Sequence, residues 1–217
     1  MSKIERRYRE RDGLQVIERA DKMPTLTGYA AVFYREGDKG TEYELWDGVV
    51  ERIAPTAFNE ALKNSDVRGL FNHEDELVLG RTFSGTMRLS VDTRGLKYEI
   101  DLPDTVTGRE VAELVRRGDI SGSSFGFIPG TTQYTRNADG TEVIERISVA
   151  LVDVGPVTFP AYTGTDASVR KITSNIEDEL RELRSTNKPV DRTAYYDAQA
   201  RAVEIQLALD SIPTTNS

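Results

Sequence analysis

Short segments of alternating apolar and polar residues, separated by turn-forming residues, recur from residue 26 to residue 152 of the chain. The clearest pair flanks the sequence DTRG at residues 92–95, and its alternation predicts a β-hairpin. Residues 26–34 predict a further strand, and residues 43–53 predict a strand or hairpin. Because strands joined by short turns pair antiparallel, the pattern predicts a core of roughly six or seven mostly antiparallel strands.

Two helical segments interrupt this pattern. After Pro55, apolar residues at helical spacing predict a short helix at residues 56–63. A second helix is predicted after Thr107, which can cap its first turn, and Gly118 is expected to end it. Two more strands are predicted at residues 124–128 and 143–152. The expected fold class is therefore α+β, mainly β.

The composition changes near residue 170, beyond which the sequence has no β-branched, strand-like run. Ile176, Leu180 and Leu183 repeat at helical spacing, and a second apolar seam at residues 195–212 follows the Pro-containing segment 185–191. We therefore divide the chain into an N-terminal arm (1–20), a β-rich core (21–168), and a linker with a helical tail (169–217). The seams predict either a tail packed on its own core or a tail that docks a partner.

Charge and cysteine content exclude several classes of protein. The chain has 28 Lys and Arg against 36 Asp and Glu, a formal net charge of −8, which argues against binding to a nucleic acid backbone. The absence of cysteine excludes disulfides, thiolate metal sites and a cysteine nucleophile. The apolar runs are far shorter than a membrane span, and charges begin at the third residue. We expect a protein without membrane span or signal peptide that works inside a cell.

The single histidine, His73, and a serine-rich segment at residues 118–127 are the two places where chemistry could sit. Serine hydroxyls become nucleophiles when a base, most often histidine, removes the proton. Each feature alone is weak, because a lone histidine is usually an ordinary polar residue and SGSS is an ordinary turn sequence. Zinc, calcium and phosphate-binding motifs and the GxSxG nucleophile elbow are all missing, so no metal or cofactor is expected.

Three ordered strings, LFNHEDELVLGRT, GDISGSSFGF and LVDVGPVTFPAY, resemble the motif blocks of the tailed-phage prohead protease family. This family comprises capsid-maturation serine proteases that are similar in fold to the herpesvirus assembly proteases. The string APTAFNEAL also matches the family, and the resemblance covers roughly residues 28–166. It implies a closed or nearly closed antiparallel β-barrel core with flanking helices.

Carried over onto this chain, the resemblance makes His73 the general base and Ser124 the nucleophile, with Ser123 the neighbour most easily mistaken for it. The acid in the third block is Asp153, which would orient His73. The herpesvirus relatives use a second histidine in this role, which this chain lacks, so the third role falls to a carboxylate or stays vacant. Glu74 is adjacent to His73 but would point away from it in an extended segment.

The resemblance also implies substrates and a location. The substrates would be the scaffold protein, the major capsid protein and the protease itself, cleaved within the assembling prohead in the host bacterial cytoplasm. Herpesvirus assembly proteases typically dimerise, so a homodimer is implied as well. Two alternatives stay open: a non-catalytic capsid-assembly or scaffolding protein that keeps the protease fold, and an unrelated esterase or amidase with the same residue pair.

Overall fold

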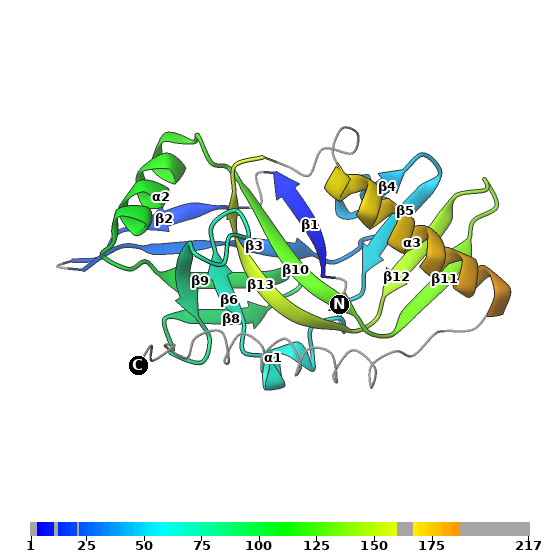
Figure 1. The fold of residues 1–217 in the computed structure, drawn as a ribbon, viewed down its shortest axis with the longest axis horizontal. Helices are drawn as coiled ribbons and strands as arrows, with labels where there is room; N and C mark the ends of the chain where they lie inside the picture. The colour runs from blue at the N-terminus through cyan, green and yellow to red at the C-terminus, as the bar shows by residue number, and fades with distance from the viewer. Residues whose placement is uncertain (1–3, 11–12, 21, 160–166, 187–217) are drawn as a thin grey trace, which may run out of the picture.

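The computed structural model describes residues 4–10, 13–20, 22–159 and 167–186. These residues form thirteen strands and three α-helices, together with a short 3-10 helix at Lys39–Thr41 (Figure 1). The helices are α1 (Ala61–Asn64), α2 (Val106–Arg117) and α3 (Ala167–Thr186). The strands are β1 (Glu5–Glu10), β2 (Gln15–Ile17), β3 (Thr25–Val32), β4 (Tyr43–Trp46), β5 (Val49–Ile53), β6 (Arg68–Leu70), β7 (Val78–Arg81), β8 (Met87–Val91), β9 (Gly95–Asp101), β10 (Gly122–Pro129), β11 (Thr132–Arg136), β12 (Glu142–Arg146) and β13 (Val149–Val157).

The strands form three sheets. One sheet has the order β1-β10-β13-β6-β7, the second β11-β12-β5-β4, and the third β2-β3-β9-β8. Most neighbours pair antiparallel, but β13 pairs parallel with β6, and β12 pairs parallel with β5. The predicted mainly β fold is therefore confirmed, as are the hairpins β4–β5 and β8–β9.

The expected closed or nearly closed barrel is wrong. Each of the three sheets in the described part of the chain has two edge strands, so no hydrogen-bonded ladder closes on itself. The edge strand β7 instead meets the third sheet through side chains, since the methyl group of Ile100 and the Cβ of Met87 approach Gly80. Closure of a barrel needs backbone pairing between the edges. Side-chain packing here fills the space that such pairing would occupy.

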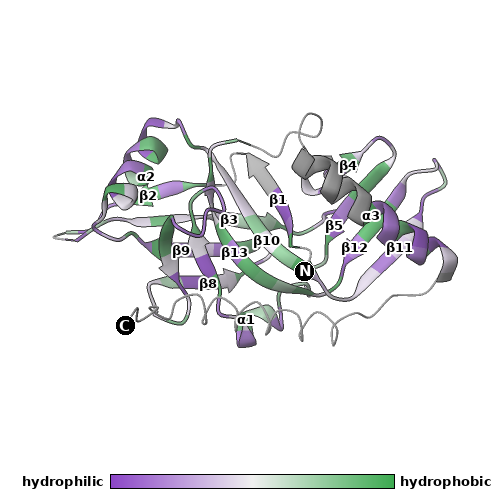
Figure 2. Cartoon of the chain, viewed as in Figure 1, coloured by the Kyte–Doolittle hydropathy of each residue, from purple (hydrophilic) through white to green (hydrophobic). Residues whose placement is uncertain are grey.

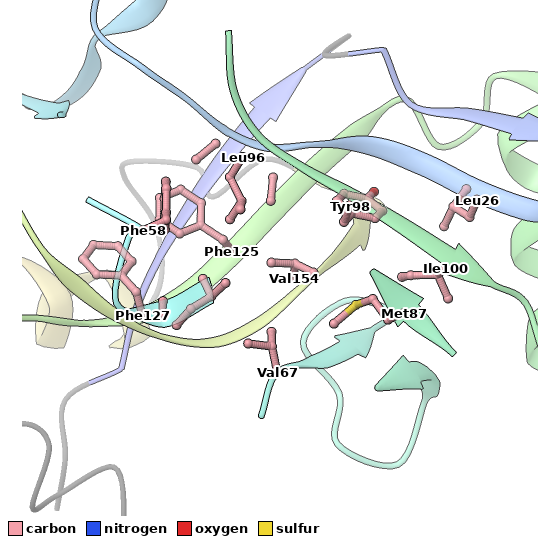
Figure 3. Packing of buried hydrophobic residues seen from close by; sticks show 14 of the residues in the cluster. Leu26, Phe58, Val67, Met87, Leu96, Tyr98, Ile100, Phe125, Phe127 and Val154 are labelled. Atoms are coloured by element: carbon pink, nitrogen blue, oxygen red, sulfur yellow. The ribbon is translucent and has the colours of Figure 1, made fainter. Parts of the chain in front are cut away.

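Strand β10 lies at the centre of the molecule, and all eight of its residues are buried. Strand β3 of the third sheet packs against it, and β1 and β13 pair with its two edges, so its sequence is a largely apolar run instead of a strict alternation. Phe125 packs edge-on against Phe58 with ring centroids 5.8 Å apart and stacks with Phe127 at 5.1 Å (Figure 3). Figure 2 shows hydrophobic residues along this strand and mainly hydrophilic ones on the described part of α3. The main hydrophobic core thus lies against the strand that carries Ser124.

Two local predictions need correction. The cap of α2 is Thr105, whose side chain accepts a hydrogen bond from the Gly108 N–H, and Thr107 lies inside the first turn. Thr105 has the extended backbone that an N-cap requires. Gly118 ends this helix as predicted, with a left-handed φ of 80°. The strand predicted at residues 143–152 is two strands, β12 and β13, in different sheets.

Helix α3 lies across the sheet β11-β12-β5-β4 (Figure 1). Ile176 and Leu180 on this helix are 1% exposed and pack with Val49 of β5 and Ile144 of β12. The first apolar seam of the tail is therefore buried against the chain's own sheet. The second seam, at residues 195–212, lies outside the described residues. None of the described helices is both long enough and apolar enough to cross a membrane.

Candidate active site

His73, Ser124 and Asp153 come together from three neighbouring parts of one sheet. Ser124 lies on β10, Asp153 on the adjacent β13, and His73 in the turn that follows β6. The His73 Nε2 atom is 2.6 Å from Ser124 Oγ, and His73 Nδ1 contacts Asp153 Oδ1. Ser124 is 3% exposed and Asp153 is 2% exposed. An imidazole between a hydroxyl and a buried carboxylate is the arrangement that activates a serine.

Asp153 reaches His73 because β13 bulges beside it. Along the β10–β13 ladder, Gly126 lies opposite Asp153 and Phe127 lies opposite Leu151, so Val152 is an extra residue on β13. Such a bulge re-aims the neighbouring side chains. A Cβ atom on residue 126 would lie 2.3 Å from Asp153 Oδ2, so only glycine leaves room for the carboxylate. The glycine of the SFGF string therefore makes space for the third residue of the cluster.

The turn that carries His73 is fastened to the end of β13 by Asn72. The Asn72 N–H donates to the Pro156 carbonyl, its side-chain oxygen accepts from the Thr158 N–H at 2.8 Å, and its amide donates to Thr158 Oγ1. Asn72 and His73 both have positive φ, 55° and 60°. Asparagine and histidine are both among the non-glycine residues that adopt this left-handed conformation more readily than most. The three hydrogen bonds hold the turn, and with it the imidazole, in place.

Ser123 faces the opposite side of β10, as alternation along a strand requires. Its hydroxyl lies 2.8 Å from the Tyr98 hydroxyl, and both side chains are buried. Burial raises the pKa of Tyr98 well above its ordinary value, so the phenol stays protonated at neutral pH. The structure thus separates the two adjacent serines. Ser124 contacts His73, and Ser123 belongs to a buried hydroxyl pair.

Ser124 has a second neighbour that sequence reasoning missed. Its Oγ lies 2.8 Å from the carbonyl oxygen of Arg7 on β1, the strand that pairs with β10 on the side opposite β13. The spacing of the motifs contains no signal for this contact, because it joins residues 117 positions apart. Asn72 lies within the first motif block, but its role emerges only from its contacts with Thr158.

The charged residues near the motifs have structural partners. Arg81 forms an ion pair with Asp66, and Arg94 stacks over the Tyr29 ring with its guanidinium carbon 4.5 Å from the centroid. Arg81 and Arg68 outweigh partial burial and lower the pKa of Asp66. Glu74 is exposed to solvent. Of the carboxylates considered for the third position, Asp153 is the one in contact with His73.

Residues 12–179 match the model of a protein family described as caudovirus prohead serine protease. The chain belongs to the caudovirus prohead serine protease family. The family resemblance of the three motif blocks is therefore confirmed. The match begins before residue 21 and ends after residue 168, the predicted limits of the core.

The family assignment rests on the family model and not on comparisons with individual proteins. No curated protein sequence matches the chain. Among solved structures, the bacteriophage T4 capsid assembly protease, gp21, aligns with a TM-score of 0.46 at 12% identity, over 71% of this chain and 96% of that one.

Proposed function

We propose that this member of a serine protease family is an active endopeptidase with Ser124 as nucleophile, His73 as general base and Asp153 as the residue that orients His73. One observation carries the proposal: the Ser124 Oγ, the two ring nitrogens of His73 and the Asp153 carboxylate form a continuous series of contacts. Proximity of nucleophile, base and orienting group is what acyl transfer by serine requires.

The reaction follows from these contacts. With the Nδ1–H of His73 donating to Asp153, Nε2 is free to accept the Ser124 proton. The Ser124 oxygen then attacks a peptide carbonyl, and His73 returns the proton to the departing amine. Water hydrolyses the resulting acyl-enzyme with His73 again acting as base.

Proteins of the immature capsid are the proposed substrates: the scaffold protein, the major capsid protein and the protease itself. The support is family membership, because the family description names a prohead serine protease of tailed phages. The proposed site of action is the assembling prohead in the host bacterium. A homodimer remains part of this proposal.

The test uses the full-length protein and three single variants, Ser124→Ala, His73→Ala and Ser123→Ala. Each is incubated at neutral pH with a fluorophosphonate, in which the serine oxygen bonds to phosphorus and fluoride leaves, and intact mass is recorded. We expect wild type and Ser123→Ala to gain one adduct, Ser124→Ala to gain none because it lacks the reacting oxygen, and His73→Ala to react slower by several powers of ten. Self-cleavage is followed in the same spectra without the reagent.

The results separate the alternatives. Equal labelling of Ser124→Ala and wild type would remove Ser124 as the nucleophile. No labelling of any protein, alone or co-expressed with its capsid protein, would favour a scaffolding protein that keeps the protease fold. Labelling and hydrolysis of small esters without cleavage of capsid proteins would favour an esterase.

A further inference from the structure

Five charged side chains from β1, β5, β12 and α3 form a buried cluster. Glu5 and Arg7 come from β1, Glu51 from β5, Arg146 from β12 and Glu179 from α3, and each is at most 8% exposed. Arg7 Nη2 donates to Glu51 at 2.8 Å and to Glu5 at 2.7 Å. Arg146 donates to Glu51 at 2.7 Å, to Glu179 at 2.6 Å and to Glu5 at 3.1 Å. Each arginine therefore bridges carboxylates from different parts of the chain.

The cluster contains three carboxylates and two guanidinium groups, so its opposite charges nearly cancel. Burial raises the pKa of Glu5, although Arg146 and Arg7 oppose the rise. Burial also acts to raise the pKa of Glu51, but Arg7 and Arg146 outweigh it and the pKa is lowered. Removing one partner from such a group leaves a buried charge uncompensated. Loss of Glu179 would therefore disturb Arg146 and, through the shared carboxylates, Arg7.

Arg7 connects this cluster to Ser124. Its carbonyl oxygen lies 2.8 Å from Ser124 Oγ, and its guanidinium carbon sits 5.3 Å from the centroid of the Phe127 ring. Among the described strands, β1 is an edge strand paired only with β10, so side-chain anchoring helps to fix its position. The clamped Arg7 side chain thus holds a backbone carbonyl against the proposed nucleophile.

The Ser124 hydroxyl has one proton and two acceptors within reach, His73 Nε2 and the Arg7 carbonyl. When Nε2 is unprotonated it can accept a hydrogen bond from the serine hydroxyl. When Nε2 is protonated it donates to Oγ, and the hydroxyl donates to the Arg7 carbonyl. Both arrangements keep Oγ in the same rotamer out of the three that a serine side chain can adopt. The carbonyl therefore favours the one rotamer from which Ser124 contacts His73.

We propose that Arg7 is a positioning residue for Ser124, and that α3 holds Arg7 in place through Glu179 and Arg146. This inference rests on the proposed role of Ser124 as nucleophile. It gives α3 a function in acylation, because the helix supplies the outermost carboxylate of the cluster. It also makes the N-terminal strand a part of the active site.

The experiment measures saturable inactivation by a fluorophosphonate in full-length wild type, Glu179→Ala and Glu177→Ala. Glu177 lies on the same helix and is exposed, so Glu177→Ala is the matched control. We expect the maximal inactivation rate of Glu179→Ala to fall on the order of tenfold, because small displacements of a reacting atom are costly, while the reagent concentration at half-maximal rate stays unchanged. Arg7→Lys, which keeps the charge but not the planar fork, is expected to show the same change.

All rates are measured well below the unfolding temperature of each variant, so that they refer to folded molecules. Glu179→Gln, which keeps an acceptor for Arg146, is measured in parallel. We expect its maximal inactivation rate to fall as well, but by less than that of Glu179→Ala. A folding defect of Glu179→Ala therefore does not decide the result. An unchanged maximal rate in the folded Glu179 variants would overturn the inference and leave the proposed function standing. A wild type that does not react with the reagent, either alone or co-expressed with its capsid protein, would overturn both.

Discussion

At the scale of single residues, two glycines in the motif blocks are explained by close approaches. Gly126 leaves room for the Asp153 carboxylate, and a Cβ on Gly155 would lie 1.9 Å from the Leu70 carbonyl oxygen. Leu70 ends the strand that leads to His73, so Gly155 allows that strand to pack closely against β13. Any side chain at either position would separate the elements that carry the site.

Gly126→Ala should therefore impair the site through Asp153. We expect a loss of roughly 1–3 kcal/mol of stability from overpacking and a fall in Ser124 labelling of roughly a hundredfold. The measurement is fluorophosphonate labelling of Gly126→Ala, Asp153→Asn and the double variant. If the effect acts through Asp153, the double variant is no slower than Asp153→Asn alone. A Gly126→Ala protein with the wild-type rate would contradict the prediction.

Asn72 should help to position His73 through both its side chain and its backbone conformation. Asn72→Gly keeps the left-handed conformation but removes both side-chain bonds to Thr158, whereas Asn72→Ala also adds strain on the order of 1 kcal/mol. We expect both variants to label roughly ten- to a hundredfold more slowly, and Asn72→Ala to be the less stable. Asn64→Ala, at an exposed position of α1, is the control. A wild-type rate in Asn72→Gly would show that only the backbone conformation matters.

Ser123→Ala should affect stability and spare activity. The substitution leaves the buried Tyr98 hydroxyl without its Ser123 partner, which costs about 1–3 kcal/mol. Removing both groups in Ser123→Ala/Tyr98→Phe should cost less than the sum of the single changes. Urea unfolding measures the stability and fluorophosphonate labelling the activity. Loss of labelling in Ser123→Ala would mean that the two serines were assigned to the wrong roles.

At the scale of elements, β10 and α3 each place different residues on different faces. Strand β10 presents Ser124 and Gly126 on one face and Ser123, Phe125 and Phe127 on the other, so one strand serves the site and the core at once. In α3 the apolar seam packs on β5 and β12. Of the two roles predicted for the first seam of the tail, packing on the chain's own core is the one observed.

Leu180→Ala should test this packing of α3. Leu180 is 1% exposed, and truncation of a buried leucine costs about 2–5 kcal/mol. Arg181→Ala, at an exposed position of the same helix, should change stability by less than about 0.5 kcal/mol. The free energy of unfolding is measured in urea. Equal stability of Leu180→Ala and wild type would mean that the helix is not packed on the sheet in solution.

At the scale of the whole molecule, the three sheets carry a large set of ion pairs. Side-chain partners outweigh burial and lower the pKa of several carboxylates. The partners are arginines for Glu51, Asp66, Asp101 and Glu142, chiefly the Tyr29 hydroxyl for Asp92, and chiefly Lys97 for Glu99. A carboxyl with a lower pKa in the folded state stabilises the fold above its unfolded-state pKa, and this stabilisation is lost as pH falls through the folded-state value. The buried Glu5, with a raised pKa, contributes in the opposite direction. More carboxyl groups have a lowered pKa than a raised one, so we expect the fold to lose stability in acid.

Asp101 gives this expectation a defined pH window. Hydrogen bonds from Arg88, outweighing partial burial, and a further one from Thr25 lower its pKa from 3.8 to about 2. Its stabilising contribution is therefore complete above 3.8 and disappears as pH falls toward 2. Asp101→Asn should lose less unfolding free energy than wild type across this window, whereas Asp104→Asn, at a largely exposed position, should follow wild type. Parallel curves for Asp101→Asn and wild type would contradict the assignment.

Much of the local structure could be predicted from sequence, because periodicity and turn residues act over a few positions. The hairpin around DTRG, the strand at residues 26–34 and the end of α2 at Gly118 are examples. The composition alone limited imidazole chemistry to His73. Motif order pointed to Ser124 and Asp153, and the structure places both in contact with that histidine.

The rest was decided by tertiary structure. The parallel pairing of β6 with β13 joins segments about 85 residues apart, and the Arg7 carbonyl reaches Ser124 from 117 residues away. Such pairings depend on which buried faces fit together after long loops have closed, and no local spacing encodes that fit. The same reason applies to the open sheets and to the bulge at Val152. The sequence alone determined which residues could perform the chemistry, and tertiary packing determined which backbone groups hold them in place.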